Sequence, residues 1–578
     1  VWNIKEVLFV KHFISRRNFL KAAGVTAAAS AMAAAVPQAS ACFLTGKDAA
    51  VTILYTNDVH TYIDNKSPKL TYAAIAAMKQ GYVDEGKPGL LVDAGDHIQG
   101  TAYGSMDDGA TIIELMNEAG YDIATLGNHE FDYGMARAKA IIKEADFPYV
   151  SCNWVDLRTG LRVLPAVKLF PAGGKWIAFV GITTPESFTK STPAYFMNAK
   201  QTKYIYDILG GDDGRKLYDA VQKAIDKAKT LGADIIIGLG HLGVDPSSSP
   251  WTSEEVIANT TGFDAFIDGH SHTVMENKQV YDAAGKAVTL TQTGSYLANV
   301  GKMTIAEDGA ITTELISTAD VSDAAVAATA EAWINDVDAM LGEQIATTDI
   351  KFYINDPAAG KRRIRMGETN LGDFVADGIY TYFNEVEKLH CDVAIMNGGG
   401  IRTDVDAGKW TFKTCKQVSP FGNVACLMSV TGKQIQDALE FGARFVGPEG
   451  KENGGFLHVA GATYEIHTDI PNTVLTDDKN VWMGSATGTP RVQNVRIYNK
   501  KTGAYEPLDL NRTYALAGMN YTLRNLGDGF AMFDGAELIK DYVSEDYLVM
   551  STYAMIFDAV NDVPVLSSAN SPLASYPG

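Results

Sequence analysis

The sequence has few cysteines and no excess of positive charge. Five cysteines occur in 578 residues, and none has metal-ligand spacing to another. With Cys42 set apart, at most two disulfides can form among Cys152, Cys391, Cys415 and Cys426. Lysine and arginine number 49 against 69 aspartates and glutamates, which gives a net charge of −20. This balance argues against general binding to nucleic-acid polymers or anionic membranes.

Long hydrophobic runs are also missing after the N-terminal region. No later stretch approaches the roughly 20 continuous apolar residues of a transmembrane helix. Because the chain is acidic overall, an anionic substrate must be attracted locally, by metal ions or a small cluster of arginines. The length exceeds the roughly 250–300 residues at which one hydrophobic core stops growing, so we expect two domains.

Residues 1–41 are predicted to be an export signal. Residues 15–21 read S-R-R-N-F-L-K, a twin-arginine motif, and an alanine-rich run follows at 22–36. A-S-A at 39–41 is typical of a signal-peptidase site, which predicts export by the twin-arginine translocation machinery to a bacterial periplasm or other extracytoplasmic space. A membrane anchor is the alternative for the alanine-rich run, which is short for that purpose. A lipid anchor at Cys42 also stays open.

After residue 50, five short apolar runs read as strands and stop abruptly at polar residues. The polar ends are N-D-V-H at 57–60, G-D-H at 95–97, N-H at 128–129, His241 and G-H-S-H at 269–272. Helical patterns lie between several of them, at 70–80, 109–119 and 217–231. Alternating strands and helices predict an α/β fold, in which ligands gather beyond the strand ends. One such ending is usually a turn or cap, whereas five together predict a site.

Aspartate, histidine and asparagine provide oxygen and nitrogen ligands, which suit Zn, Mn, Co or Fe better than a thiolate site would. Two ions about 3.5–4 Å apart need a bridging carboxylate, and they can then clamp a phosphoryl group and generate hydroxide near neutral pH. We expect Asp96 to be the bridge, because it stands alone at its strand end. The candidate ligands are sufficient for two ions: Asp58, His60, Asp96, Asn128, His241, His270 and His272.

The five blocks, in this order, resemble those of the calcineurin-like metallophosphoesterases. T-N-D-V-H at 56–60 and N-H-E-F-D-Y-G at 128–134 are similar to the 5′-nucleotidase and UDP-sugar hydrolase family. The resemblance implies a four-layer β-sandwich flanked by helices, with two divalent metal ions. It implies one metal site from Asp58, His60, Asp96 and His272, and a second from Asp96, Asn128, His241 and His270.

The resemblance further implies that His129 contacts the phosphoryl or leaving-group oxygen and that Asp132 orients His129. An imidazole that donates to developing oxyanion charge needs its other nitrogen held, and a carboxylate both holds it and raises its pKa. The alternative for Asp132 is a cap on the following helix. Glu130 is expected to cap a helix or support the site, and His97 to support the site or face solvent.

Beyond residue 300 the chain changes character. Residues 321–345 are rich in alanine and acidic residues with helical periodicity, which predicts a connecting helix. We expect a catalytic domain at 50–318, the connecting helix at 319–345 and a smaller α/β substrate-binding domain at 346–567. As the resemblance implies, rotation about the connector would open and close a cleft between the domains.

The second half contains two arginines, Arg365 and Arg402, that are candidates for binding an anionic group. Arg402 follows the glycine run 398–400, and glycines let the backbone approach an anion that a guanidinium can grip. A flexible turn is the alternative for such a run. The resemblance assigns phosphate recognition to Arg365 and Arg402, with Gly400 in the same loop. Arg362 and Arg363 are expected on a solvated face.

The resemblance places the nucleoside near Phe421 and Asp528. Phe421 can stack on a base, with a core phenylalanine as the alternative, and Asp528 can accept from two ribose hydroxyls. Asn397 and Asn423 are plausible polar contacts around the base. The segment 520–529 is one residue longer than the family pattern and has leucine for its first glycine, so the register of the second aromatic, Tyr521, stays open.

The predicted function is an exported two-metal phosphohydrolase that cleaves nucleoside 5′-monophosphates, with other nucleotides or UDP-sugars in the same class, by attack of metal-bound hydroxide. A 2′,3′-cyclic nucleotide phosphodiesterase with 3′-nucleotidase activity is the second candidate, and a thiosulfohydrolase the third. A non-catalytic surface nucleotide-binding protein is the alternative from another class. Its signature would be missing ligands, and none of the seven is missing.

Overall fold

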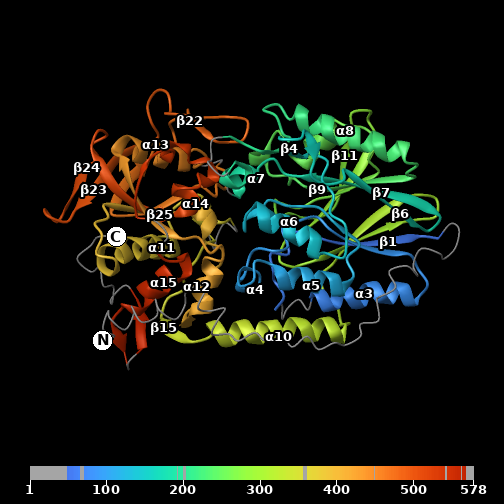
Figure 1. Cartoon of the computed structure of the whole chain (residues 1–578), viewed down its shortest axis with the longest axis horizontal. Helices are drawn as coiled ribbons and strands as arrows, with labels where there is room; N and C mark the ends of the chain where they lie inside the picture. Colours follow the sequence, from blue (N-terminus) through green and yellow to red (C-terminus); the bar gives the residue numbers. More distant parts are fainter. Residues whose placement is uncertain are drawn as a thin grey trace.

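The structure is a computed structural model that describes residues 49–64, 70–191, 193–198, 203–355, 361–447, 450–540, 543–560 and 563–567. The expected export signal and Cys42 lie outside these ranges. An N-terminal and a C-terminal domain lie side by side, and helix α10 (Ala324–Leu341) runs along one side of the molecule between them (Figure 1).

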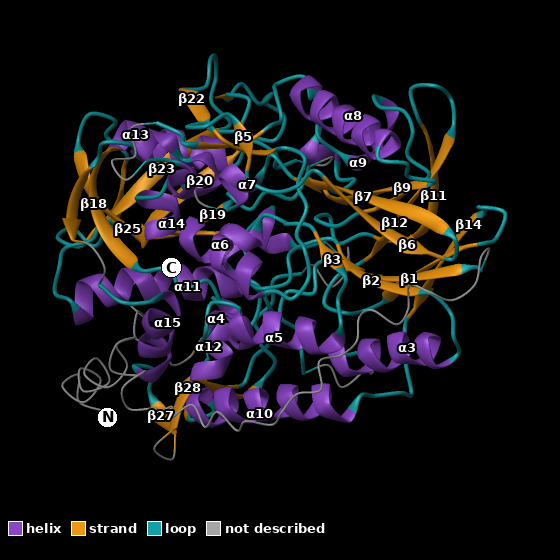
Figure 2. Cartoon of the chain, turned by 45° about the vertical axis from the view of Figure 1, so that its right-hand side comes forward, coloured by secondary structure: helices purple, strands orange, loops and turns teal. Residues whose placement is uncertain are grey.

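The N-terminal domain is built on two sheets that pack face to face (Figure 2). The first has the strand order β14-β13-β1-β2-β3 and the second the order β11-β12-β10-β9-β7-β6. The strands of the first sheet are β1 (Val51–Thr56), β2 (Gly89–Asp93), β3 (Ile123–Ala124), β13 (Val300–Ile305) and β14 (Ile311–Ile316). Those of the second are β6 (Val167–Ala172), β7 (Lys175–Thr183), β9 (Ile235–His241), β10 (Ala265–Ile267), β11 (Val274–Tyr281) and β12 (Ala287–Thr293).

Alternation of side chains along the strands gives this domain its layers. Ile53 and Tyr55 of β1 pack with Ile237 of β9 between the two sheets, whereas Leu54 faces the opposite way, toward helices. Helices α3 (Tyr72–Asp84) and α5 (Ala110–Ala119) cover the first sheet, and α8 (Arg215–Thr230) and α9 (Ser253–Ala258) cover the second. The predicted four-layer sandwich is confirmed.

The strands that carry the polar ends run parallel within each sheet. β1, β2 and β3 are parallel neighbours, and so are β7, β9 and β10. Parallel strands present their carboxyl ends at the same edge of a sheet, and here the two sheets present those edges together. This topology brings residues far apart in sequence to one rim.

The C-terminal domain is a smaller α/β unit. Its central sheet has the order β19-β16-β25-β18-β26, with α11 (Asn370–Thr381) on one face and α13 (Gly432–Gly442) on the other. The strands are β16 (Val393–Asn397), β18 (Ala425–Thr431), β19 (Leu457–Ala460), β25 (Thr513–Met519) and β26 (Glu537–Lys540). A short hairpin of β21 (Leu475–Thr476) and β22 (Trp482–Gly484) extends toward the N-terminal domain.

Helix α10 begins after Asp323, whose carboxylate accepts from the backbone amide of Ala325 at 2.9 Å. It packs on α3, α5 and α4 (Ala102–Ser105), and Trp333 Nε1 donates to the carbonyl of Tyr103 at 2.8 Å. The helix ends at Leu341, and Ile345 lies in strand β15 (Gln344–Thr348), so the helix is shorter than predicted. These contacts fix α10 to the N-terminal domain.

Two expectations about membranes and cysteines can be compared with the structure. Within the described ranges, no helix is long and apolar enough to cross a membrane. Cys152, Cys391, Cys415 and Cys426 are buried, and no disulfide links any two of these four.

Candidate active site

The seven predicted ligands come together at the rim formed by the strand ends. His60 Nε2 lies 3.1 Å from His272 Nε2 and 3.8 Å from Asp96 Oδ2. His241 Nε2 lies 3.1 Å from the same Asp96 oxygen. Potential ligand atoms within 4.8 Å of one another form three groups, of which two are Asp58 with His60 and His272, and Asp96 with His241 and His270. Asp96 also belongs to a third group with His60 and His129, which places it between the other two.

The backbone of these ligands is unusual. Asp58, His60, Asp96, His270 and His272 all have positive φ, between 49° and 79°. Non-glycine residues rarely adopt this conformation, and such strain concentrates at functional sites where the surrounding structure enforces it. Five candidate ligands with this backbone conformation, on three loops, indicate that the fold holds these side chains in place.

The donor set fits divalent cations. Asn128 Oδ1 is buried and has no hydrogen-bond partner in the described part of the chain, although a buried carbonyl oxygen normally finds one. Gly127 has no room for a side chain, because a Cβ there would lie 2.1 Å from Asp96 Oδ1. An oxygen and nitrogen donor set with an unpartnered amide oxygen is compatible with a divalent metal ion.

Burial and the mutual charges of the carboxylates and imidazoles shift the pKa values of the cluster residues. Burial raises the pKa of Asp58 to about 7. Burial alone would lower the pKa of His241, but Asp96 and Asp58 outweigh it and raise that pKa to about 10. In the same way, the charges of His241 and His129 outweigh burial and hold the pKa of Asp96 well below its usual value. A proton on His241 thus compensates the neighbouring carboxylates, and a divalent cation would displace it.

His129 and Asp132 form a close pair at the cavity wall. His129 Nδ1 lies 2.5 Å from Asp132 Oδ2, and the His129 Nε2 atom lies 4.0 Å from Asp96 Oδ2. Burial lowers the pKa of His129, but Asp132 and Asp96 outweigh it and raise that pKa. Asp132 does not cap the next helix, α6 (Met135–Glu144), because the N-cap residue is Gly134 and no side chain caps this helix. The arrangement leaves Nε2 of His129 on the side of Asp96.

Glu130 and His97 are structural supports of the same rim. The Glu130 carboxylate accepts from the backbone amides of Asp96 at 2.9 Å, His97 at 2.8 Å and Gly127 at 2.6 Å. His97 is fully buried, with Nδ1 2.9 Å from Asp93 Oδ1 and Nε2 2.8 Å from the Tyr149 hydroxyl. The solvent-facing alternative for His97 is therefore wrong.

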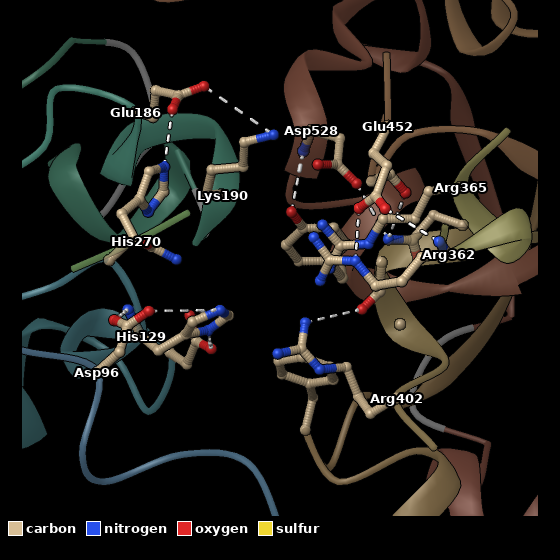
Figure 3. Close-up of a pocket in the computed structure, with 18 of the residues that line it drawn as sticks. Asp96, His129, Glu186, Lys190, His270, Arg362, Arg365, Arg402, Glu452 and Asp528 are labelled. Carbon is tan, nitrogen blue, oxygen red and sulfur yellow. Dashed lines mark hydrogen bonds and ion pairs between the residues drawn. The ribbon is translucent and has the colours of Figure 1, made fainter. Parts of the chain in front are cut away.

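A cavity of about 160 Å³ lies between this rim and the C-terminal domain. Figure 3 shows Asp96, His129, Glu186 and His270 on one side and Arg362, Arg365, Arg402 and Asp528 on the other. The predicted residues that line the cavity are Asp96, Asn128, His129, Asp132, His270, His272, Arg365, Asn397, Gly400, Arg402, Phe421, Asn423, Tyr521 and Asp528. Asp58, His60 and His241 are fully buried behind the wall.

The C-terminal side of the cavity is positively charged. Gly398 packs closely against the carbonyl of Ile364, because a Cβ added at this position would lie 2.1 Å from that oxygen. This close approach brings the loop of Arg402 next to Arg365. Burial and the charges of Arg362 and Arg402 lower the pKa of Arg365 to about 9. Arg365 stays charged at neutral pH, but its charge is costly until an anion approaches.

The sequence-based placement of Arg362 is wrong. Instead of lying on a solvated face, Arg362 lines the cavity, and its Nε donates to Glu452 Oε2 at 2.5 Å. The cause is the short helical turn Arg363–Arg365, which points Arg362 and Arg365 inward and leaves Arg363 exposed. Arg363 therefore lies where it was expected.

The predicted nucleoside contacts lie together at this wall. Asp528 Oδ2 accepts from Asn397 Nδ2 at 3.0 Å, and the Asp528 amide donates to the Tyr521 hydroxyl at 3.1 Å. The longer loop fits because Leu526 adopts a left-handed conformation with φ of 60°, which sets Gly527 against the Tyr521 ring. The Phe421 ring centre lies 5.9 Å from that of His129 and 5.6 Å from Arg402 Cζ.

Sequence reasoning missed four charged residues of the cavity, Glu186, Lys190, Asp245 and Glu452. Glu186 is 3% exposed and accepts from Ser248 Oγ at 2.6 Å. Burial alone would raise its pKa, but Lys190 and His270 outweigh burial and lower it to about 2. The available signal was its place after β7, a sixth parallel strand that ends at the same rim.

Comparison with known proteins agrees with this geometry. The family model of the calcineurin-like phosphoesterases matches residues 51–274, and that of the 5′-nucleotidase C-terminal domain matches residues 344–535. The model of the twin-arginine translocation pathway signal sequence matches residues 14–33, so the chain carries a signal for export to the extracytoplasmic space by that pathway. The chain is thus a metal-dependent phosphoester hydrolase with divalent metal ions as its cofactors.

Individual relatives are similar along nearly the whole length. The 5′-nucleotidase of Rattus norvegicus is 28% identical over 587 residues, covering 92% of this chain and 93% of the relative. The trifunctional nucleotide phosphoesterase protein YfkN of Bacillus subtilis is 28% identical over 87% of this chain and 33% of its own. The crystal structure of the 5′-nucleotidase precursor from Thermus thermophilus superposes with a TM-score of 0.71 at 25% identity, covering 90% of this chain and 100% of that chain. The chain belongs to the 5′-nucleotidase family.

Proposed function

We propose that the protein hydrolyses nucleoside 5′-monophosphates to nucleoside and inorganic phosphate outside the cytoplasm. One observation carries the proposal: the ligand cluster of one domain and the arginines, Phe421 and Asp528 of the other line a single cavity. A phosphoryl group held by the arginines would face the ligand cluster. The nucleoside would then extend along the C-terminal wall.

In this proposal, Asp58, His60 and His272 would hold one metal ion, Asn128, His241 and His270 would hold a second, and Asp96 would contribute to both sites. When bound, the ions would supply Lewis-acid stabilisation and an activated water for in-line attack on phosphorus. The buried, unpartnered Asn128 Oδ1 and the compact donor groups support this assignment.

His129 acts on the substrate oxygen through Nε2, since Asp132 occupies Nδ1. The raised pKa of His129 favours its protonated form, which can donate a hydrogen bond as negative charge develops on the phosphoryl or leaving-group oxygen. Arg365 and Arg402 bind the phosphate with charge-assisted hydrogen bonds. The negative charge of the bound phosphate would relieve part of the repulsion among these arginines.

The nucleoside contacts follow from the groups on the C-terminal wall. The Asp528 carboxylate accepts from the ribose hydroxyls, while Phe421 and Tyr521 offer aromatic faces to the base. Asn397 and Asn423 provide amide groups for polar contacts. This wall favours a nucleotide over a sulfur-carrier conjugate, because a thiosulfohydrolase needs neither aromatic faces nor a ribose acceptor.

The test is a substrate panel with metal-loaded protein. AMP, 2′,3′-cyclic AMP, UDP-glucose and ATP are supplied separately, and released phosphate and nucleoside are quantified. The proposal predicts adenosine and phosphate in equal amounts from AMP, with the highest kcat/KM of the four. Faster hydrolysis of 2′,3′-cyclic AMP than of AMP would overturn it in favour of the phosphodiesterase alternative.

Domain movement is part of the proposed cycle, because neither wall alone holds a nucleotide in reactive geometry. Helix α10 packs mainly on the N-terminal domain, with a smaller contact to α12 (Phe412–Val418), so we place the pivot after Leu341, at Gly342 and Glu343, and not within the helix. The C-terminal domain would swing on this pivot to admit substrate and release products.

A further inference from the structure

Glu186 has no role in the proposed chemistry, yet it is a buried carboxylate that reaches the ligand cluster. It lies at the carboxyl end of β7, and its Oε2 atom lies 2.8 Å from His270 Nε2 and 2.6 Å from Ser248 Oγ. Its side chain is 4% exposed, and Lys190 Nζ lies 4.0 Å from the other carboxylate oxygen. A buried carboxylate with three polar neighbours is held firmly in one orientation.

The contact determines which ring nitrogen of His270 is left for an ion. A carboxylate can only accept, so the Nε2–H of His270 donates to Glu186, and the Nδ1 lone pair is the one that remains. Figure 3 shows the His270 ring directed toward Glu186, with one ring nitrogen joined to its carboxylate, and a ligand atom of His270 lies within 4.8 Å of those of Asp96 and His241. The imidazole is therefore fixed both in tautomer and in rotation about its side-chain bonds.

Two other histidines of the cluster, His60 and His241, are held in the opposite sense. His60 Nδ1 lies 2.8 Å from the carbonyl of Gln99, and His241 Nδ1 lies 2.7 Å from the carbonyl of Ala94. Both rings therefore present Nε2 to the cluster, whereas His270 presents Nδ1. Backbone carbonyls orient the first two histidines, and His270 alone in this comparison depends on a side chain that mutation can remove.

We propose that Glu186 is a positioning residue that locks His270 in its Nε2-protonated form and directs Nδ1 to the metal ion shared with Asp96 and His241. The inference rests on the proposed assignment of His270 as a ligand. Carboxylate partners of metal-bound histidines commonly orient the ring and raise its basicity, and their loss typically costs about 10–100-fold in metal affinity. Glu186→Ala should therefore weaken one of two metal sites and leave the other unchanged.

The first measurement is calorimetric titration of chelator-treated protein with Mn²⁺. Glu186→Ala is expected to bind one equivalent with wild-type affinity and the other about 10–100-fold more weakly. Glu186→Gln, which keeps a hydrogen-bond acceptor of the same shape, should fall between Glu186→Ala and wild type. Glu254→Ala is the control, because it removes a carboxylate of the same domain that pairs with Lys278 and lies outside the cavity lining, and its Mn²⁺ affinities should equal those of wild type.

The second measurement reads the tautomer directly, by ¹⁵N-histidine NMR of the metal-free protein, with the His270 signal identified by its loss in His270→Ala. The wild type should show protonated Nε2, and Glu186→Ala should show a mixture of tautomers. Wild-type affinities and tautomer in both Glu186 variants, with an ion lost in His270→Ala, would overturn the inference and leave the proposed function standing. Wild-type Mn²⁺ affinities in His270→Ala would instead remove His270 from the ligand set. That result would refute both the inference on Glu186 and the proposed metal assignment on which it rests.

Discussion

His129 Nδ1 lies 2.5 Å from Asp132 Oδ2, so the imidazole that faces the cavity is held by a carboxylate three residues along the chain. The pair sits on the turn His129–Phe131, directly after the strand end that delivers Asn128. One short loop thus provides a candidate metal ligand, a substrate-facing group and the residue that orients it.

The first prediction concerns this pair. His129→Ala should lower kcat for AMP by about 10²–10⁴-fold with a small change in KM, because the lost interaction forms only in the transition state. Steady-state kinetics at saturating metal check this. An unchanged kcat in His129→Ala would contradict the assigned role.

Asp132→Asn should act through the pKa of His129. Because Asp132 raises that pKa, its replacement lowers it, and His129 then loses its proton at a lower pH. The alkaline limb of the kcat profile should therefore move to lower pH than in the wild type. A profile that drops uniformly without moving would indicate a merely structural role.

The arginine cluster allows a matched comparison. Arg402→Ala should reduce kcat/KM for AMP by about 10–100-fold, since a charge-assisted hydrogen bond contributes about 1.5–3 kcal/mol. Arg363→Ala is the control, because Arg363 is exposed and its Nε donates only to the carbonyl of Glu368 among the described contacts. Equal losses in the two variants would refute phosphate recognition by Arg402.

Contact between the domains gives a test of domain movement. Lys479, on the hairpin turn between β21 and β22, has Nζ 2.9 Å from Asp207 Oδ1 and 4.1 Å from the centre of the Phe188 ring. Lys479→Ala should shift the molecule toward open forms, seen as a larger radius of gyration in solution scattering and a higher KM. Lys216→Ala, which removes a looser exposed pair at 3.9 Å from Asp478, should change neither.

Stability should fall in acid because of His458. Burial lowers the pKa of this histidine to about 4, from 6.5, so between these values the unfolded chain binds a proton that the folded protein excludes. Unfolding therefore becomes easier as pH falls through this window, by about 2 kcal/mol at pH 5. His458→Gln lacks this titration, and its loss of stability between pH 7.5 and pH 5 should be smaller by about that amount in denaturant melts. Equal losses in both proteins would contradict the prediction.

Much of the candidate site was predictable because its ligands follow strands. A buried strand that ends at Asp58 or His241 leaves a periodic signal, and the parallel order then brings such ends together. Glu186 ends a strand too, but a lone glutamate after T-T-P carries no ligand pattern, so its contact with His270 emerges only in three dimensions.

The placement of Arg362 shows a different limit. Four residues with three arginines, R-R-I-R at 362–365, look alike in sequence, and the direction of each side chain depends on one helical turn. That turn sets Arg362 against Glu452, which is 90 residues away along the chain. Local composition contains no information on that contact.

The most direct test of the central claim is metal-dependent release of adenosine and phosphate from AMP. Chelator-treated protein receives Mn²⁺ in steps while initial rates are recorded. We predict no activity without metal, a rise that saturates at two equivalents, and a strongly reduced rate at every step for Asp96→Asn, the shared ligand. Full activity in the presence of chelator, or no hydrolysis of AMP at any metal content, would contradict the account.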